Sequence, residues 1–307
     1  MTISAHKVIA RLTIALCVMS VAVAGQRRPA TTAGASTFVI NTEPNAIVWI
    51  DEIRRGTTDA AGRIELKASP GRHAVRVRAG GFKEVTVPLL AGRRTLSVKL
   101  VRTTDQAELL FQRAEEARDK ARDDAAKQEA ADLYRQTLQA RSSFPAARVG
   151  LARVLLDLNQ YREALAEIDA ARRVRRVYPE ASAVEGRIHR EAAFTDDAIA
   201  SFRRSIREAK GFQPEAHVGL ARVLEEQGNY VDAEAEYRKA IAQLSDSEPV
   251  IYQMLGATYE KQQKHKQAVA AYEKYLALAP NGSLAPAIRS IIDQLRREAE
   301  GGLEIIP

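Results

Sequence analysis

A small residue recurs at a nearly constant interval through much of this 307-residue chain. Four residues after each of these positions stands a large side chain, which is apolar or aromatic. The local period of apolar residues in this part is helical. A repeat of this length predicts paired helices that stack on their neighbours, because one pair cannot bury its apolar face alone. The small positions, separated by 34, 34, 35 and 35 residues, are Ala130, Ala164, Ala198, Ala233 and Ala268, and the large ones are Tyr134, Ile168, Phe202, Tyr237 and Tyr272.

A second small position precedes the first by twelve residues in the last four repeats, whereas Arg118 holds that place in the first repeat. Small side chains there allow two antiparallel helices to approach closely. We therefore expect Ala233 to lie at a contact between helices, and Glu234 to face solvent. The second set of small residues is Ala152, Gly186, Ala221 and Gly256.

These spacings resemble the tetratricopeptide repeat (TPR). The resemblance is strongest in the last two repeats, in Gly228-Asn229-Tyr230 with Ala233, and in Leu255-Gly256 with Tyr259. It implies an all-α superhelix, an α-solenoid, of about five repeats over residues 106–300, in which a C-terminal helix caps the last repeat. In the family, the concave side of such an array receives a peptide or a partner helix.

Residues 37–101 follow a different period. Apolar residues alternate with polar ones in short runs, and turn residues such as Glu43-Pro44-Asn45 and Asp59-Ala60-Ala61-Gly62 separate the runs. Short alternating strands at regular spacing predict a small antiparallel β-sandwich. Residues 44–51, 69–77 and 80–82 resemble the PEGA domain, and residues 57–66 resemble the carboxypeptidase regulatory-like domain. Both families are compact, non-catalytic β modules of surface and envelope proteins.

The N-terminus has the order of a secretory signal. Lys7 and Arg11 precede an apolar run at residues 12–23, and Ala22-Val23-Ala24 supplies small residues at alternate positions. We expect residues 1–25 to be a signal peptide, residues 26–36 to be a linker, and the protein to be exported to the periplasm or cell surface. Retention of the run as an anchor is the alternative. The single cysteine, Cys17, lies within this run, so the cleaved chain would form no disulfide.

The sequence contains no constellation that predicts catalysis. It has no Gly-x-x-x-x-Gly-Lys phosphate loop, no Gly-x-Ser-x-Gly elbow and no His-Glu-x-x-His zinc helix. Its five histidines are scattered singly, so we expect no metal site, no cofactor and no enzymatic activity. The net charge of +7 is spread along the chain rather than gathered in a basic arm, and we expect no nucleic-acid partner.

Three arginines form the candidate partner-binding site. Arg153, Arg187 and Arg222 each follow the small position by one residue, at intervals of 34 and 35 residues. In the family this place lies near the concave groove, and a ladder of guanidinium groups there would suit an acidic peptide. The alternative is a self-neutralised face, because an acidic residue follows each arginine by four positions, where intrahelical pairs can form. Those acidic residues are Asp157, Glu191 and Glu226.

Trp49 is the second candidate. Val48 and Ile50 should face the core, which places Trp49 on the opposite face of its strand. There it could stack on a sugar or a partner, or it could pack against the linker or the repeats. The function predicted is a non-enzymatic envelope scaffold whose TPR groove binds a protein or peptide. The alternatives are a glycan- or peptidoglycan-associated module, and an accessory subunit of an envelope enzyme or transport complex.

Overall fold

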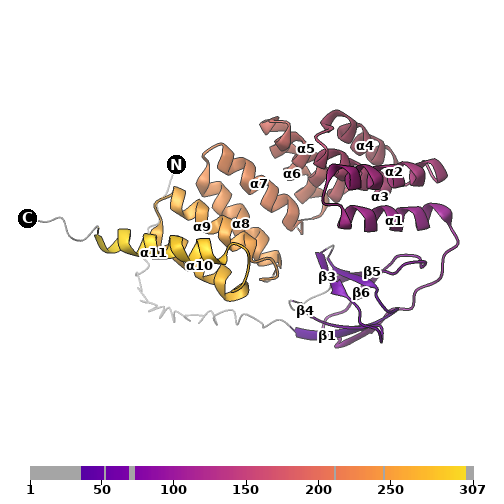
Figure 1. The fold of residues 1–307 in the computed structure, drawn as a ribbon, viewed down its shortest axis with the longest axis horizontal. Coiled ribbons are helices and arrows are strands. Elements are labelled where there is room, and N and C mark those ends of the chain that lie inside the picture. The colour runs from indigo at the N-terminus through magenta and orange to yellow at the C-terminus, as the bar shows by residue number, and fades with distance from the viewer. Residues whose placement is uncertain (1–35, 52, 69–72, 211, 245, 302–307) are drawn as a thin grey trace, which may run out of the picture. The chain divides into compact units, whose positions relative to one another are not determined.

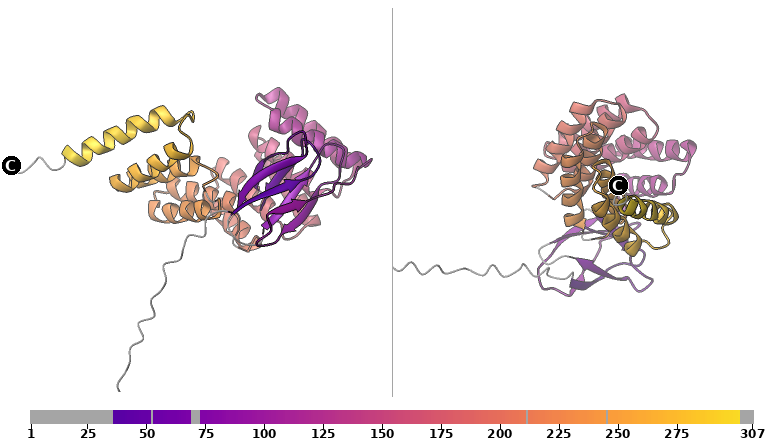
Figure 2. Two further views of the ribbon diagram at one scale, coloured as in Figure 1. Left: turned by 90° about the horizontal axis from the view of Figure 1, so that it is seen from below. Right: turned by 90° about the vertical axis from the view of Figure 1, so that its left-hand side faces the viewer.

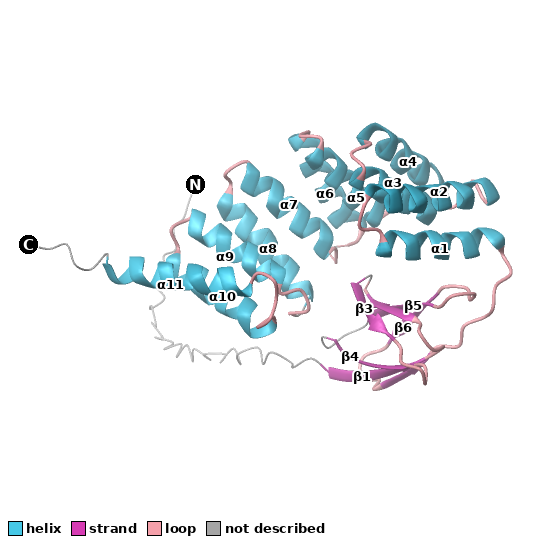
Figure 3. Ribbon diagram, in the orientation of Figure 1, coloured by secondary structure: helices cyan, strands magenta, loops and turns pink. Residues whose placement is uncertain are grey.

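The computed structural model describes residues 36–51, 53–68, 73–210, 212–244 and 246–301. The predicted signal peptide, nearly all of the predicted linker and the first residues of the PEGA-like stretch 69–77 therefore lie outside the described residues. Strands occupy the part before residue 98, and helices follow from residue 106 (Figure 1, Figure 3). The strands are β1 (Ser36–Asn41), β2 (Ile47–Ile50), β3 (Ile53–Thr57), β4 (Arg63–Ala68), β5 (His73–Arg78), β6 (Val85–Leu89) and β7 (Thr95–Ser97).

The strands form two sheets that share one hydrophobic core. One sheet has the order β4-β1-β7 and the other has the order β3-β2-β5-β6. Ile40 of the first sheet and Val48 and Val75 of the second are fully buried in a single cluster. The expectation of purely antiparallel pairing is wrong for one pair, because β1 and β7 run parallel. Parallel strands cannot be joined by a tight hairpin. Between β1 and β7 the chain passes through the other sheet, and β7 follows β6 of that sheet.

Eleven helices follow in the described residues, and they run as five antiparallel pairs with one additional helix. Each pair packs on the next, and α11 packs on α10 at the end of the series (Figure 2). The helices are α1 (Gln106–Lys120), α2 (Asp124–Ala140), α3 (Pro145–Asp157), α4 (Tyr161–Val174), α5 (Pro179–Glu191), α6 (Thr195–Glu208), α7 (Pro214–Glu226), α8 (Tyr230–Leu244), α9 (Val250–Lys261), α10 (His265–Leu278) and α11 (Ala285–Gly301).

The turn between the two helices of a pair has the same backbone conformation in four repeats. One residue there adopts a positive φ: 59° at Asn159, 61° at Ala193, 75° at Gly228 and 58° at Gln263. In each case the next amide donates to a carbonyl five residues earlier, which ends the first helix in a left-handed cap. The 34- or 35-residue period of the sequence therefore includes the turns as well as the core.

The predicted small and large positions form the core of the helical array. All five alanines of the first set are fully buried, and their large partners are at most 1% exposed. Phe202 of α6 shows how closely the helices approach, because a Cβ atom at Gly186 or Gly219 would lie 2.7 or 2.3 Å from its ring. Neither place could take a larger side chain without moving Phe202, so the glycines set the spacing between α5, α6 and α7.

The orientation expected for Ala233 is confirmed, but that expected for Glu234 is wrong. Ala233 is fully buried, and Glu234 beside it is only 7% exposed. The Glu234 carboxylate lies 2.6 Å from Arg238 and 2.8 Å from Lys264. These cations compensate the charge that burial would otherwise leave unpaired.

Candidate functional site

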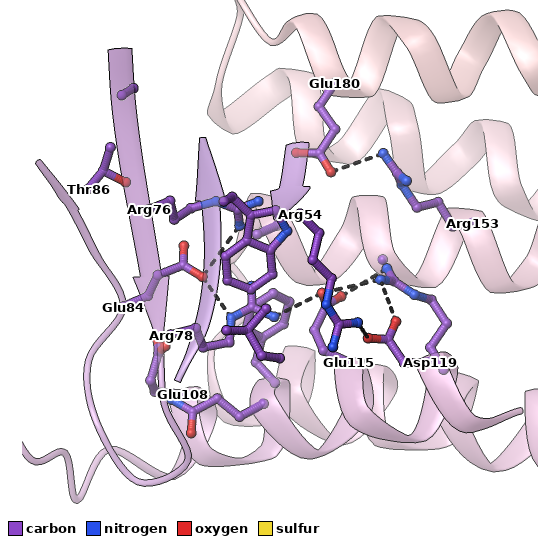
Figure 4. Close-up of a pocket in the computed structure, with 18 of the residues that line it drawn as sticks. Arg54, Arg76, Arg78, Glu84, Thr86, Glu108, Glu115, Asp119, Arg153 and Glu180 are labelled. Atoms are coloured by element: carbon purple, nitrogen blue, oxygen red, sulfur yellow. Dashed lines mark hydrogen bonds and ion pairs between the residues drawn. The ribbon is translucent and has the colours of Figure 1, made fainter. Parts of the chain in front are cut away.

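The first helix of each pair contributes to one continuous surface. Helix α3 lies against α1 and α5, and α5 lies against α7. Side chains from α1, α3 and α5, with Glu215 at the start of α7, face the outer side of the β3-β2-β5-β6 sheet across a cavity of about 1930 Å³, which we call the cleft (Figure 4). The sheet contributes Trp49, Arg54, Arg76 and Arg78 to its lining, and the helices contribute Glu115, Arg153, Glu180 and Glu215.

The helical side of the cleft follows the repeat register. We define three groove positions on the first helix of each pair by their distance from its small residue: six residues before it, three residues before it and one residue after it. Arg118 is counted as the small position of the first repeat. Seven groove positions line the cleft. They are Gln112, Glu115 and Asp119 in the first repeat, Ala146 and Arg153 in the second, Glu180 in the third and Glu215 in the fourth.

Arg153 is held in the cleft by carboxylates of the next two repeats. Its guanidinium lies 3.1 Å from Glu180 and 3.4 Å from Glu215, and its side chain is 22% exposed. Burial alone would lower the pKa of Arg153, but the attraction of Glu215 and Glu180 outweighs it, and the pKa is raised. Arg153 is therefore charged and already paired within the molecule.

The other two arginines of the predicted ladder are held less tightly. Arg187 lies 3.9 Å from Asp157 and 3.7 Å from Glu215, which are long distances for ion pairs. Arg222 is exposed, and the described residues provide no ion-pair partner for it. Neither Arg187 nor Arg222 lines the cleft. They occupy the position equivalent to Arg153 in the third and fourth repeats, outside the cleft.

The intrahelical pairing expected for these arginines is wrong. Asp157, four residues after Arg153, instead pairs with Arg187 on the next first helix. Glu226, four residues after Arg222, lies 3.5 Å from Arg190 on α5. The first helices lie close enough side by side for ion pairs to form between repeats, so Asp157 and Glu226 pair across helices, whereas Glu191 pairs with Arg190 of its own helix.

Trp49 faces outward from its sheet, as predicted, and is half-buried in the lining of the cleft. The Arg76 guanidinium carbon lies 4.3 Å from the indole centroid, and that of Arg78 lies 5.1 Å away. Cations at these distances interact with the ring face. The indole is therefore part of a packed arginine–aromatic layer.

The β region contacts α1 through a set of polar interactions that the sequence analysis did not identify. Arg78, only 8% exposed, lies 2.7 Å from Glu84 of its own region and 3.0 Å from Glu115 of α1. The Gln112 side chain donates to the Phe82 carbonyl at 2.7 Å and accepts from the Gly81 amide at 3.0 Å. Arg54 and Asp119 add an exposed pair at 2.9 Å. The repeat register could have indicated this set, because Asp119 stands where the next three repeats have arginine.

Glu115 is the centre of this contact. Besides Arg78, it pairs with Arg118 at 3.0 Å and accepts a hydrogen bond from the Tyr134 hydroxyl. Burial alone would raise the pKa of Glu115, but Arg118, Arg78 and the hydrogen bonds from Tyr134 and Arg78 lower it to about 2. The carboxylate is therefore ionised at neutral pH and connects the β region with both helices of the first repeat.

The described residues contain no group of three or more side chains suited to hold a metal ion. Three histidines instead lie near carboxylates: His73 is 2.6 Å from Asp51, His217 is 2.5 Å from Glu236 and His189 is 4.0 Å from Glu185. Within the same described residues, no helix has both the length and the apolar character that a membrane crossing requires.

Comparison with known proteins identifies the repeats. Residues 121–188 and 212–281 match models of the tetratricopeptide repeat. Among solved structures, a thermophilic TPR protein of Thermus thermophilus is 18% identical with a TM-score of 0.51, over 62% of this chain and 98% of that chain. MamA residues 41 to the end, from Desulfovibrio magneticus RS-1, is 17% identical with a TM-score of 0.47, over 58% and 98%. YrrB, a TPR protein with an unusual peptide-binding site, is 17% identical with a TM-score of 0.44, over 61% and 94%.

No curated protein matches the chain. The predicted helical array is confirmed by the matches to both halves of the repeat region and by the structural likeness to the Thermus protein. The chain thus carries tetratricopeptide repeats, which stack into superhelices with extended concave binding surfaces.

Proposed function

We propose that this chain is a non-enzymatic scaffold, and that the groove positions of its second to fourth repeats bind a segment of a protein partner. The observation that carries the proposal is the cleft of about 1930 Å³, which follows the repeat register on one side and is closed by a sheet face on the other. The cleft also has aromatic contact surface, because Phe212 lies in its lining with 37% of its area exposed. Aromatic side chains supply much of the contact energy in protein interfaces.

The charge distribution supports a partner that brings few charges to the cleft itself. Arg153 is paired there with Glu180 and Glu215, so a ligand gains little from competing for it. Arg222 is exposed at the equivalent groove position of the fourth repeat, where a carboxylate of the partner would meet a guanidinium without displacing an internal one. An acidic contact is therefore proposed at Arg222 only. A free sugar platform at Trp49 is disfavoured, because two arginines already lie against the ring.

Photocrosslinking tests the location of the binding surface. Replacing Phe212 with a photoreactive phenylalanine analogue in the full chain, produced in its native cells, should crosslink a specific protein. Phe194 is the matched control, because it is 57% exposed and does not line the cleft. The same adduct from both positions, or an adduct from position 194 alone, would contradict the proposal.

We also propose that the protein acts in the bacterial envelope and that the β region is a PEGA-like sandwich domain spanning residues 37–101. The basic residues, apolar run and small residues of the first 25 positions support export, and the shared core of the two sheets supports a compact module. N-terminal sequencing of the cell-fractionated protein should find a start near Gly25 or Gln26. An intact Met1 in the cytoplasmic fraction would overturn the proposed location.

A further inference from the structure

The groove positions of the first repeat are already occupied by the chain itself. Gln112, Glu115 and Asp119 bind the loop at residues 81–82, Arg78 and Arg54 of the β region, respectively. The corresponding residues of the second repeat are Ala146, Val149 and Arg153, and among the described residues Arg153 binds Glu180 and Glu215 of later helices instead of the β region. The β region thus occupies the groove at the first repeat as an internal ligand.

This contact is polar and leaves the two hydrophobic cores separate. The core of the β region and the core that begins at Phe111 contain no residue in common. Among the contacts between the two regions, Arg54 and Asp119 are 50% and 40% exposed, whereas the Arg78–Glu115 pair is shielded and the Arg78 guanidinium carbon also lies 5.0 Å from the centroid of the Phe111 ring. Polar interfaces between regions of one chain commonly permit relative motion, whereas a merged hydrophobic core would not.

The covalent connection has one obvious place to bend. Residues 101–103 are fixed to the β region, because the Lys83 amide donates to Val101 at 2.8 Å and the Thr103 amide donates to Gly81 at 2.9 Å. Asp105 is fixed to the helices, since its carboxylate caps the amides of Ala107 and Glu108. The single residue between these anchors is Thr104, which is exposed. One hydrogen bond spans it, from the Asp105 amide to the Thr103 hydroxyl at 3.2 Å, and it would have to break for the chain to bend there.

We propose that the β region is a gate: it closes over the groove through its contacts with Gln112, Glu115 and Asp119, and it swings about Thr104 to admit the partner. This inference rests on the proposed function, because it assumes that the groove is the binding surface. It adds that binding competes with an internal contact. A partner that needs the open groove must displace the gate, and its apparent affinity is its intrinsic affinity multiplied by the fraction of molecules in which the gate is open.

The Gly81 amide reports gate opening without any partner. Its acceptor is the Gln112 side chain of α1, so the docked β region slows its hydrogen exchange and departure of the β region from α1 speeds it. Arg54→Glu places a carboxylate beside Asp119, and the repulsion should speed exchange at Gly81 roughly fivefold if the gate moves as one body. The double variant Arg54→Glu/Asp119→Arg restores an opposite-charge pair and should return exchange at Gly81 towards the original rate.

Two controls make the result specific. Arg63→Glu makes the same change at an exposed site on β4 away from α1 and should leave Gly81 unaffected. The Val77 amide, within the β2–β5 ladder, should keep its rate in every variant, which shows that the β region stays folded. Unchanged exchange at Gly81 in Arg54→Glu, or a failure of the double variant to restore it, would overturn the gate.

The crosslink from position 212 distinguishes failure of the gate from failure of the proposed function. Crosslinking from this position should increase in Arg54→Glu. Loss of that crosslink together with faster exchange at Gly81 would reject the binding surface while keeping the moving gate.

Discussion

Glu115→Ala is expected to lower the free energy of unfolding by about 3 kcal/mol, because Arg78 and Arg118 lose the carboxylate that they share and keep only Glu84 and Asp119, respectively. Arg78 is 8% exposed and Arg118 is 26% exposed, and both pair with Glu115. Tyr134 would lose the acceptor of its hydroxyl hydrogen bond in the same variant. Chemical denaturation of the full chain measures the change. Glu116→Ala is the matched control, since that carboxylate is 64% exposed and pairs with the exposed Lys120, so its removal should change the free energy of unfolding little.

The same residue should make stability depend on acid. The pKa of Glu115 is about 2 in the folded chain, below its ordinary value of 4.5. Its stabilisation is therefore complete above pH 4.5, falls as the pH drops towards 2, and amounts to about 3 kcal/mol. This part of the acid dependence should disappear in Glu115→Ala and persist in Glu116→Ala. An identical acid dependence in all three proteins would contradict the assignment.

Phe202→Ala should cost about 3–5 kcal/mol, as large-to-small changes of fully buried aromatic residues do. The ring fills the space left by Gly186 and Gly219, so its loss opens a cavity between the third and fourth repeats. Because each repeat is stabilised by its neighbours, the thermal transition should also broaden as the two halves of the array separate. Differential scanning calorimetry measures both effects.

Phe194→Ala is the corresponding control for Phe202. The side chain immediately precedes α6 and is 57% exposed, and its ring contact is an edge-on approach to His189 at 6.2 Å. Its removal should change the free energy of unfolding by no more than about 0.5 kcal/mol. Equal destabilisation by the two substitutions would mean that the helical register derived from the repeat is incorrect.

The sequence was sufficient for the helical array because its period determines several features at once. The small residue, the large residue four places later and the left-handed turn all recur in register, so each repeat supports the assignment of the others. The β region was less predictable. Strand β3 contains Arg54, Arg55 and Gly56, which do not alternate in polarity, and its place in the sheet depends on pairing with β2.

The candidate site was only partly predictable for a related reason. The sequence indicated that Arg153 belongs to the groove surface, but nothing in a single helix shows that Glu180 and Glu215 of later repeats reach it. Ion pairs between stacked helices depend on the superhelical spacing, whereas intrahelical pairs depend only on sequence separation. The contact between the β region and α1 was missed because it depends on how two regions dock.

Side-chain oxidation footprinting of the unmodified full chain tests the central claim most directly. It is done with and without the partner that the crosslinking experiment identifies. It compares Phe212 in the cleft with Phe194 outside it, two exposed phenylalanines of the same intrinsic reactivity. If the groove positions bind the partner, oxidation of Phe212 should fall several-fold on binding while oxidation of Phe194 stays constant. Protection of Phe194 with Phe212 still fully reactive would contradict the account.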